Sequence, residues 1–441
     1  MMDTLPLDPA GDYFDPEVET MSRENIERLQ EARILQLVPY VYARSKLTRK
    51  IWDRAGITPS DIRSLADFRE KVPFINKDSI REYRDENSDP FGGLLCASPP
   101  HLSGVGFTSG TTGDPTPVPR ASESLNQYHQ KRDYWQIGAR AGDYVTYMLN
   151  TFRLGHHSDR WRSVGYRMFP LEHAASEIPR LIEGSRLLKP KVLHMISSPM
   201  ILALEKYQNQ TGTDLREAFS SYLGAVFGGE PLGPRSRKMV ESWGLEIFQY
   251  GNLGDICGLM ECREHDGMHT WEDMVLVEHI DPVTTEPAAD GTRGELVVTA
   301  LMDDVAPLVR YRTDDLVEFT RAPCRCGRNH GRMKPIGRIG DEMLIQGKSV
   351  LPVDLLPILQ DIPATCAGLF QLIRPSREMD TLSLRVGFDE SLIEGSEQAL
   401  MGEIADRVRS ALSVPVRVEL RSNADLLKLG PPHKIPRVTK Q

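Results

Sequence analysis

The 441-residue sequence lacks any apolar run that approaches the ~18 residues needed to span a bilayer. Its first residues, MMDTLPLDPAGDYFD, are acidic and lack the basic and apolar regions of a secretory signal. Basic residues are not in excess either: the formal net charge is -9, whereas nucleic-acid-binding surfaces are usually basic. These absences predict a cytoplasmic protein that binds neither membrane nor nucleic acid.

Cysteine is also scarce, with 6 residues in the whole chain. So few cysteines in so long a chain do not form a disulfide scaffold, which agrees with a reducing cytoplasm. Apolar residues, by contrast, make up 40% of the sequence, enough for ordinary hydrophobic cores. The length allows about two or three domains.

Short apolar segments alternate with longer amphipathic ones from about residue 140 onwards. Four of them are predicted to be buried strands: VTYMLN (145–150), VLHMIS (192–197), LGAVFGG (223–229) and LEIFQYG (245–251). Between them, IPRLIEGSRLLK and PRSRKMVESWG have the pattern of crossover helices. Strands that alternate with helices indicate βαβ units and a mainly parallel sheet. The later segment 274–301 predicts a β-hairpin, because two apolar runs flank a Pro/Gly/Asp-rich turn.

The two ends of the chain have patterns of their own. Near the start, ENIERLQEARILQLVPYVYARS has apolar residues at helical spacing and predicts a helix that is broken near Pro39. After residue 337, short strands alternate with two helices over about 100 residues, enough for a small α+β domain. The sequence thus predicts an N-terminal domain over residues 1–337 and a C-terminal domain over residues 338–441.

Residues 107–120, FTSGTTGDPTPVPR, are rich in Ser, Thr and Gly. Gly110 and Gly113 allow the backbone to curl and turn its N–H groups inward, where they can meet phosphate oxygens without a lysine. The hydroxyl groups that add further donors belong to Thr108, Ser109, Thr111 and Thr112. On composition alone, a solvated surface loop explains the stretch equally well.

The string T-S-G-T-T-G-x-P resembles the phosphate loop of the acyl-adenylate-forming enzymes, which include acyl-CoA synthetases, luciferases and peptide-synthetase adenylation domains. Further motifs that resemble those of this superfamily follow in order: FGGEPLG (227–233), RYRTDDL (310–316), GRIGDEMLIQG (337–347) and HKIPRV (433–438). Within the superfamily, YGNLGDICGLMECREHDGMHTWEDM and CRCGRNH are most similar to phenylacetate–CoA ligase and its relatives. The resemblance covers nearly the whole chain.

This resemblance implies roles for individual residues. Asp315 would accept hydrogen bonds from both ribose hydroxyls of ATP, and Lys434 would be the catalytic lysine. Arg338 and Asp341 occupy the hinge positions between the two domains. Besides residues 108–113 and Asp315, the implied ATP contacts are Gly228, Gly229, Glu230, Tyr250, Gly251, Asn252 and Arg338. A lysine suits the chemistry, because charge builds on phosphate oxygens when a carboxylate attacks the α-phosphorus and pyrophosphate leaves.

The implied fold is an α/β protein with a large N-terminal domain of mixed sheets and packed helices, followed by a small, mobile α+β C-terminal lid. The implied reaction is ATP-dependent activation of an aromatic or arylacetic carboxylic acid as acyl-AMP, with CoA as the acceptor. An alternative within the superfamily is an adenylating enzyme of secondary metabolism that uses a carrier protein or another nucleophile as acceptor, including the chemistry of ATP-dependent diazotases. A non-catalytic nucleotide-binding scaffold is an alternative of a different class, and a homodimer is left open.

One motif departs from the family pattern. The family's Y-G-x-x-E places a Glu on the Mg²⁺ ion that bridges the ATP phosphates, and here the Glu position is Gly254. Asp255 could serve instead if the loop holds one extra residue, because a carboxylate on a hard cation is the essential chemistry. Gln346 likewise stands where relatives often carry Arg.

The cysteines suggest a second metal ion. The candidate ligands are Cys262, His269, Cys324 and Cys326, the last two in a C-x-C turn. Three thiolates and one imidazole suit tetrahedral Zn²⁺, and some relatives of phenylacetate–CoA ligase carry a zinc ion in such segments. His265 and His330 are competing ligands. Free cysteines beside a surface histidine are the alternative interpretation.

The resemblance also places the acid pocket, between the segment YVTYMLNTFRLGHH and the strand-turns at residues 227–229 and 250–254. Arg153, His156 and His157 follow the predicted strand in this segment and could contact a polar acid. Because loop histidines are more often simply solvated, both interpretations stay open.

Overall fold

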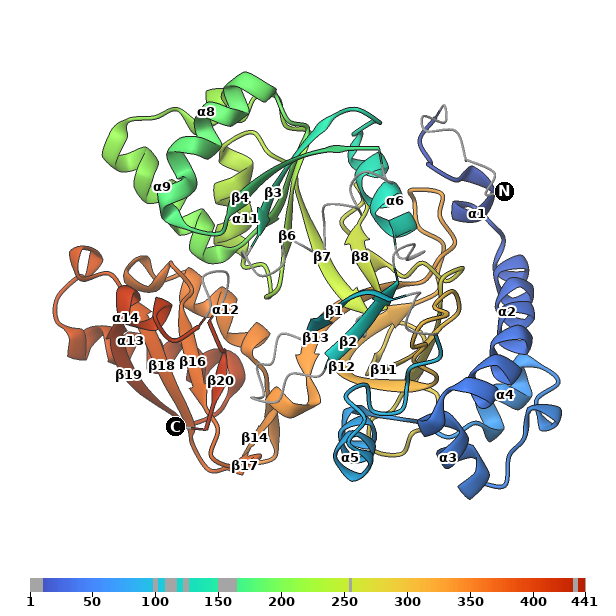
Figure 1. Cartoon of the computed structure of the whole chain (residues 1–441). Helices are drawn as coiled ribbons and strands as arrows, with labels where there is room; N and C mark the ends of the chain where they lie inside the picture. Colours follow the sequence, from blue (N-terminus) through green and yellow to red (C-terminus); the bar gives the residue numbers. More distant parts are fainter. Residues whose placement is uncertain are drawn as a thin grey trace. The chain divides into compact units, whose positions relative to one another are not determined.

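The computed structural model describes residues 11–97, 102–107, 117–121, 127–149, 165–253, 256–430 and 435–440 (Figure 1). Contacts divide the chain into two compact units. The first consists of Met1–Ala141, Gly155–Gly165 and Tyr250–Lys334, and the second of Gly142–Leu154, Tyr166–Gln249 and Pro335–Gln441. The domain boundary between residues 337 and 338 stays a prediction.

Helices of the first unit lie mainly in the N-terminal part of the sequence. They are α1 (Pro16–Glu19), α2 (Arg23–Arg44), α3 (Lys46–Arg54), α4 (Leu65–Lys71), α5 (Lys77–Asn87) and α6 (Gln127–Ile137) (Figure 1). Helix α2 begins after Ser22, whose hydroxyl accepts a hydrogen bond from the backbone N–H of Asn25 and so caps the helix. Buried residues of α2, α3 and α4, among them Trp52 and Phe68, then form one apolar cluster.

Helix α2 contains Pro39, and the predicted break there is wrong: the helix is continuous over 22 residues from Arg23–Arg44. Proline has no backbone N–H and so leaves the carbonyl of Leu35 without its helical hydrogen bond. Leu35 and Pro39 both lie on the exposed side of the helix, where water can satisfy that carbonyl. Burial of Ile34 and Val41 against α3 and α4 stabilises the helix on both sides of the proline.

Strands of the first unit are largely antiparallel. β1 (Leu102–Phe107) and β2 (Pro117–Ala121) form a separate pair. The other strands follow the order β10-β11-β12-β13-β9-β8, with bounds β8 (Cys257–Glu261), β9 (Met268–His269), β10 (Val275–Ile280), β11 (Arg293–Ala300), β12 (Tyr311–Thr320) and β13 (Arg332–Arg338), the last of which continues into the second unit. β10 and β11 form the hairpin predicted for residues 274–301, and all of β10 is buried.

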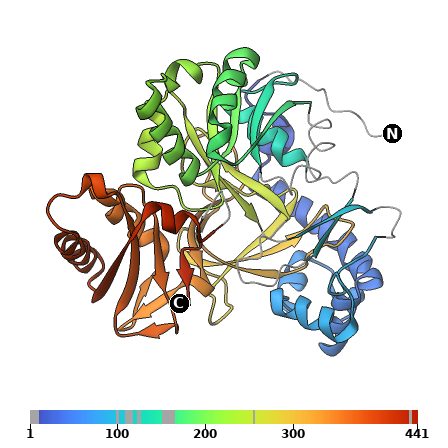
Figure 2. The ribbon, with the colours of Figure 1, turned by 60° about the vertical axis from the view of Figure 1, so that its left-hand side comes forward.

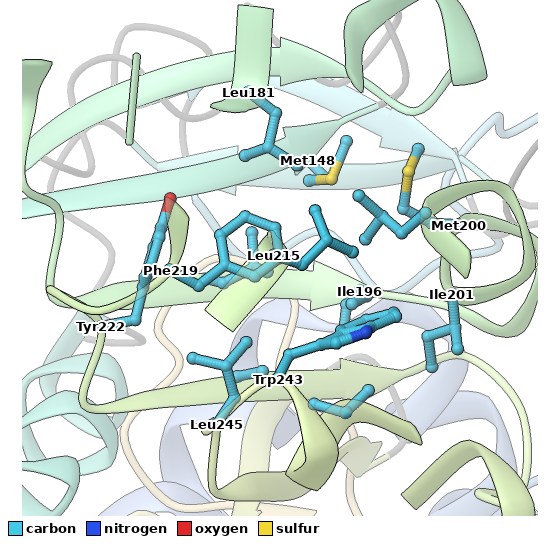
Figure 3. Packing of buried hydrophobic residues seen from close by; sticks show 14 of the residues in the cluster. Met148, Leu181, Ile196, Met200, Ile201, Leu215, Phe219, Tyr222, Trp243 and Leu245 are labelled. Atoms are coloured by element: carbon cyan, nitrogen blue, oxygen red, sulfur yellow. The ribbon is translucent and has the colours of Figure 1, made fainter. Parts of the chain in front are cut away.

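The second unit contains a parallel arrangement with strand order β6-β5-β3-β4. Its strands are β3 (Tyr144–Leu149), β4 (Arg167–Glu172), β5 (Val192–Ile196) and β6 (Gly224–Gly228), and its helices are α8 (Ile178–Leu188), α9 (Ser198–Thr211), α10 (Leu215–Ala218) and α11 (Pro234–Ser242). The predicted strands and crossover helices all form. Figure 3 shows the apolar cluster between them, in which Phe219 and Trp243 are almost fully buried. Strand β7 (Ile247–Leu253) carries the chain into the first unit.

The last hundred residues form two small sheets. β14 (Met343–Ile345), β15 (Lys348–Val350) and β17 (Glu378–Met379) form one, and β16 (Phe370–Ile373), β18 (Leu382–Phe388), β19 (Val416–Ser422) and β20 (Val438–Thr439) form the other in the order β19-β18-β16-β20. The helices are α12 (Pro352–Gln360), α13 (Glu397–Leu412) and α14 (Asn423–Leu427). Figure 2 shows this C-terminal part of the chain in orange and red. Leu400, Ile404 and Val408 of α13 belong to the same apolar cluster as buried residues of β16 and β18.

Short 3₁₀ turns complete the described secondary structure: η1 (Pro59–Asp61), η4 (Ala175–Glu177), η5 (Ile339–Asp341), η6 (Pro363–Thr365) and η7 (Glu390–Leu392). None of the described helices combines the length and the apolar character that crossing a membrane requires.

Candidate nucleotide site and metal-ligand cluster

Part of the predicted site lies outside the described residues. This part comprises the loop residues Thr108, Ser109, Gly110, Thr111, Thr112 and Gly113, the pocket residues Arg153, His156 and His157, the metal candidate Asp255, and Lys434. Their roles stay predictions. The remaining candidates lie at the ends of β6 and β13, on β7 and β12, and around the cysteine-rich turn before β13.

Gly228 ends β6, and Gly229 and Glu230 follow it at the carboxyl edge of the parallel strands, the edge where ligands of such sheets bind. Gly229 has a φ of 92°, which a side chain would strain, so glycine permits the sharp turn there. The two carboxylate oxygens of Glu230 have different partners. One accepts from the backbone N–H of Ser198 at 3.1 Å, and the other from Arg437 at 2.8 Å. The turn is therefore tied to the start of α9 and to the segment that follows Lys434.

Tyr250, Gly251 and Asn252 lie on β7, which pairs with β8 in antiparallel register. The Tyr250 hydroxyl donates to Asn252 Oδ1 at 3.3 Å. A Cβ atom on Gly258, across the ladder, would lie 2.3 Å from the Tyr250 hydroxyl oxygen. The absence of a side chain at Gly258 thus leaves the space that the tyrosine occupies.

Asp315 lies at a bulge in β12. Glu295 pairs with Leu316 and Val297 with Arg312, so three residues of β12 stand opposite one residue of β11. The Thr313 hydroxyl replaces backbone hydrogen bonds that the bulge interrupts. It donates to the carbonyl of Leu296 at 2.9 Å and accepts from the Asp315 N–H at 3.1 Å. Bulges re-aim side chains near functional sites, and this one sets the direction of a half-buried carboxylate.

Arg338 is the last residue of β13, and Asp341 is the last residue of the turn η5 that follows it. Arg338 is exposed and Asp341 is half-buried. The residue after this turn, Glu342, is buried and held by two side chains: Ser349 Oγ and Arg377 Nη2 each donate to its carboxylate at 2.8 Å. A fixed segment thus begins directly after the predicted hinge.

The four predicted metal ligands lie together. Cys262 follows β8, His269 lies on β9, and Cys324 and Cys326 lie in the turn between β12 and β13. All four candidate ligand atoms lie within 4.8 Å of one another. Cys262 Sγ is 3.7 Å from Cys324 Sγ, and Cys326 Sγ is 3.3 Å from His269 Nε2. Sulfurs on a tetrahedral zinc ion, at about 2.3 Å each, would lie about 3.8 Å apart, so this spacing fits the ion.

The imidazole of His269 has the orientation that a ligand needs. Its Nδ1 donates to the carbonyl of His330 at 3.3 Å, which leaves the Nε2 lone pair facing Cys326. The competing ligand His330 has both ring nitrogens engaged elsewhere, with the N–H of Glu272 and the carbonyl of Val18.

The other competitor, His265, is 3.2 Å from the Glu261 carboxylate through its Nδ1. Neither His265 nor His330 belongs to the cluster of candidate ligands in the described part of the chain.

The thiols of the cluster have unequal proton affinities. A hydrogen bond from the Cys262 thiol holds the pKa of Cys326 far below its ordinary value, with further help from His269. The same hydrogen bond, together with burial, raises the pKa of Cys262. One thiolate is therefore already favoured before any cation arrives, which suits a site for a thiolate-binding metal.

Buried ion pairs surround this cluster, and sequence inspection missed them. Arg132 of α6 makes two parallel hydrogen bonds to Asp273, at 2.8 and 2.9 Å, and Arg328 pairs with Glu19 at 2.6 Å. All four side chains are at most 6% exposed. The only signal for Arg328 was its place in CRCGRNH, and no motif marked its partner, 309 residues away.

Comparison with curated proteins shows similarity over almost the whole chain. The chain is 32% identical to a phenylacetate-coenzyme A ligase of Thermus thermophilus, with 96% of each chain covered. The chain belongs to the phenylacetate-coenzyme A ligase family. It is also 27% identical to the phenylacetate-coenzyme A ligase of Escherichia coli, with 92% of each covered. No protein-family model matches the chain.

Solved structures agree with the family assignment and confirm the predicted fold class. A 2-hydroxyisobutyryl-CoA ligase, crystallised in the postadenylation state with an acyl-AMP, is 25% identical and superposes with a TM-score of 0.85 over 98% of this chain and 93% of that one. An anthranilate CoA ligase, 18% identical, shares the fold with a TM-score of 0.57. This member of the phenylacetate-coenzyme A ligase family is accordingly an AMP-forming acid–CoA ligase of the adenylate-forming superfamily.

Proposed function

We propose that the protein activates an aromatic or arylacetic carboxylic acid with ATP to form an acyl-AMP, and then transfers the acyl group to CoA. The observation that carries this proposal is the 32% identity to a phenylacetate-coenzyme A ligase over 96% of both chains. The carboxylate attacks the α-phosphorus of ATP and pyrophosphate leaves. The CoA thiol then attacks the acyl carbonyl, AMP leaves with the electron pair of the broken bond, and the thiol proton is lost.

Each predicted residue has a role in this scheme. Asp315 accepts hydrogen bonds from the ribose hydroxyls, and the bulge in β12 aims its carboxylate. Residues 108–113 wrap the phosphates with N–H and O–H donors. Lys434 stabilises the negative charge that develops as pyrophosphate leaves. Asp255 would hold a Mg²⁺ ion if the loop contains one extra residue, and that ion would supply further positive charge to the phosphates.

The cluster of Cys262, His269, Cys324 and Cys326 is proposed to hold a structural Zn²⁺. Four protein ligands leave no open position for a substrate, so the ion would stabilise the fold without taking part in the chemistry. It would join β8, β9 and the turn before β13. Two of its ligands, Cys262 and Cys324, lie 62 residues apart in the sequence.

Pyrophosphate release tests the acid and the acceptor together. The purified protein is given ATP and Mg²⁺ with benzoate, phenylacetate, an aliphatic 2-hydroxy acid or no acid, each with and without CoA. We expect turnover with an aryl or arylacetic acid and CoA, and at most a stoichiometric burst when CoA is left out. Turnover with the 2-hydroxy acid alone would contradict the aromatic substrate, and sustained turnover without CoA would point to another acceptor. Adenylation of none of the acids would contradict the proposed substrate class.

A further inference from the structure

The N-terminal segment of residues 13–21 packs against the turn that carries two of the cluster cysteines. The Tyr13 hydroxyl donates to the carbonyl of Cys326 at 2.8 Å, and the Asn329 side-chain amide donates to the carbonyl of Met21 at 3.1 Å. His330 adds a hydrogen bond to the carbonyl of Val18 at 2.9 Å. The segment is thus held by the same turn, residues 324–330, that contributes Cys324 and Cys326 to the cluster.

Arg328 connects the N-terminal segment of residues 13–21 with the cysteine-bearing turn. Its Nε and Nη2 donate to Glu19 Oε2 at 2.9 and 2.6 Å, and its Nη1 donates to Cys326 Sγ at 3.6 Å. The guanidinium also lies over the Tyr13 ring, 5.0 Å from its centre. Side-chain exposure is 3% for Arg328 and 0% for Glu19, so water does not weaken these interactions.

We propose that Arg328 is a positioning residue of the metal centre that couples metal binding to the docking of residues 13–21. This inference rests on the proposed Zn²⁺ site. Three thiolates and a neutral imidazole around Zn²⁺ carry one net negative charge, and a buried charge needs a compensating partner. Arg328 places its guanidinium beside Cys326 and donates a hydrogen bond to that sulfur, while Glu19 fixes the orientation of the guanidinium. Such outer partners orient metal ligands and strengthen metal binding.

Metal loss has a defined consequence in this arrangement. Without the ion, Cys324 and Cys326 lose their connection through the metal to Cys262 after β8 and to His269 on β9, and the hydrogen bond from His269 to the carbonyl of His330 remains at the other end of the turn. The carbonyl of Cys326 and the guanidinium of Arg328 are then no longer held in place for Tyr13 and Glu19. The N-terminal segment therefore loosens when the metal leaves, and metal release speeds up when Arg328 or Glu19 is changed.

The competing explanation is an ion pair that fills the interior and is indifferent to the metal. Arg132 and Asp273 provide such a pair in the same unit, with no cysteine among the hydrogen-bond partners of the Arg132 guanidinium that the structure describes. The two explanations differ in one measurable quantity, the rate at which the full-length protein releases its zinc.

The experiment compares Arg328→Lys and Glu19→Gln with the matched control Arg325→Lys. Arg325 lies in the same turn, but its side chain is 84% exposed and pairs with Glu264 at 2.9 Å. Zinc content is measured first, followed by zinc release to a chromophoric chelator and hydrogen exchange of residues 13–21. Cobalt substitution adds the thiolate-to-metal absorption band as a direct view of the ligands.

We expect zinc release to be ~10-fold faster in Arg328→Lys and Glu19→Gln, with a shifted cobalt band in Arg328→Lys and faster exchange of residues 13–21. The Arg325→Lys control should match the wild type within about twofold. Wild-type release rates in both test variants, or unchanged exchange of residues 13–21 after chelation of the wild type, would overturn the coupling alone. A wild-type protein that binds neither zinc nor cobalt would overturn the metal centre, and the coupling with it, while leaving acid activation intact.

Discussion

In the second unit, parallel strands β3, β5 and β6 meet helices α8, α9 and α11 across apolar side chains. In the first unit, helix α6 instead brings Arg132 and Asp133 into the interior, beside Asp273, Glu19 and Arg328. The apolar core needs only complementary shapes, whereas every ion in the other core needs its partner. Loss of one side chain should therefore have different consequences in the two units, and these differences can be measured.

A large effect is expected in the ion-filled interior. Asp273→Ala leaves the Arg132 guanidinium buried without the carboxylate that it contacts twice, and should lower the free energy of unfolding by about 3–5 kcal/mol. Urea denaturation followed by far-UV circular dichroism measures it. The double variant Arg132→Met/Asp273→Leu removes both charges and should recover most of the loss. If the double variant were as unstable as Asp273→Ala, the ion pair would stabilise the fold by more than the neutralisation of two buried charges.

The apolar core of the second unit provides the counterpart. Phe219 is 1% exposed and packs edge-on against Tyr222, with ring centres 5.7 Å apart (Figure 3). Phe219→Ala should lower the free energy of unfolding by about 3–5 kcal/mol through the cavity it leaves, with no change in zinc content. Leu187, which is 71% exposed, gives the control Leu187→Ala. A Phe219→Ala protein that unfolds at the wild-type urea midpoint would contradict this account of the core.

The third prediction concerns Lys434, the predicted catalytic lysine, whose replacement should slow the reaction without destabilising either core. Lys434→Ala should slow acyl-AMP formation by about 10²–10³-fold, because a cation aimed at developing charge acts in the transition state. Single-turnover formation of acyl-AMP measures it, and the exposed Lys440 provides the control Lys440→Ala. The unfolding curve should stay unchanged. If Lys434→Ala formed acyl-AMP within a few-fold of the wild-type rate, Lys434 would not be the catalytic lysine.

A smaller effect is expected at the bulge of β12. Asp315→Ala should weaken ATP binding by about 1–3 kcal/mol, the cost of losing hydrogen bonds to a charged group. Isothermal titration calorimetry with ATP and with its 2′-deoxy analogue gives the test. The variant should bind the two nucleotides almost equally, whereas the wild type should prefer ATP. If the wild type bound ATP and 2′-deoxy-ATP equally well, the proposed contact between Asp315 and the ribose would be contradicted.

An effect of similar size depends on pH. Burial raises the pKa of Asp133 well above its usual range, despite the opposing influence of the Trp271 indole and Arg132. A folded-state pKa above the unfolded value contributes stability that is present below about pH 3.9 and is lost as pH rises through the folded pKa. Asp133→Asn should therefore raise the free energy of unfolding by about 1–3 kcal/mol at pH 8, with a smaller gain at pH 5. Equal unfolding curves at pH 8 would show that Asp133 ionises freely.

The contrast between an apolar core and buried ion pairs also explains which parts of the fold could be predicted from the sequence. Apolar periodicity located β3, β5, β6 and the crossover helices, because burial of an apolar face leaves a regular pattern. It did not predict the continuity of α2 through Pro39, which depends on packing against α3 and α4. Ion pairs such as Arg328 with Glu19 leave no periodic pattern, since their members lie far apart in the sequence.

Site residues divide in the same way. The cysteines and His269 could be grouped because their side chains have a distinctive chemistry, and the structure brings all four together. The choice of His269 over His265 and His330 could not be made from spacing, since it depends on which ring nitrogens are already engaged. The contact between Glu230 and Arg437 could not be predicted either, because nothing in the sequence links a turn after β6 to a segment 207 residues later.

The bulge in β12 sets how this strand responds to changes in length. Its three residues opposite one give the strand two more residues than a regular ladder requires. Removal of two residues would restore the ladder and keep the side chains beyond it on their original faces, but would abolish the bend that aims Asp315. Removal of one would leave two residues opposite one, the count of an ordinary bulge, so buried Val317 and Phe319 would keep their register while Asp315 would be turned in a new direction. The strand therefore tolerates a change in length at the bulge better than the site does.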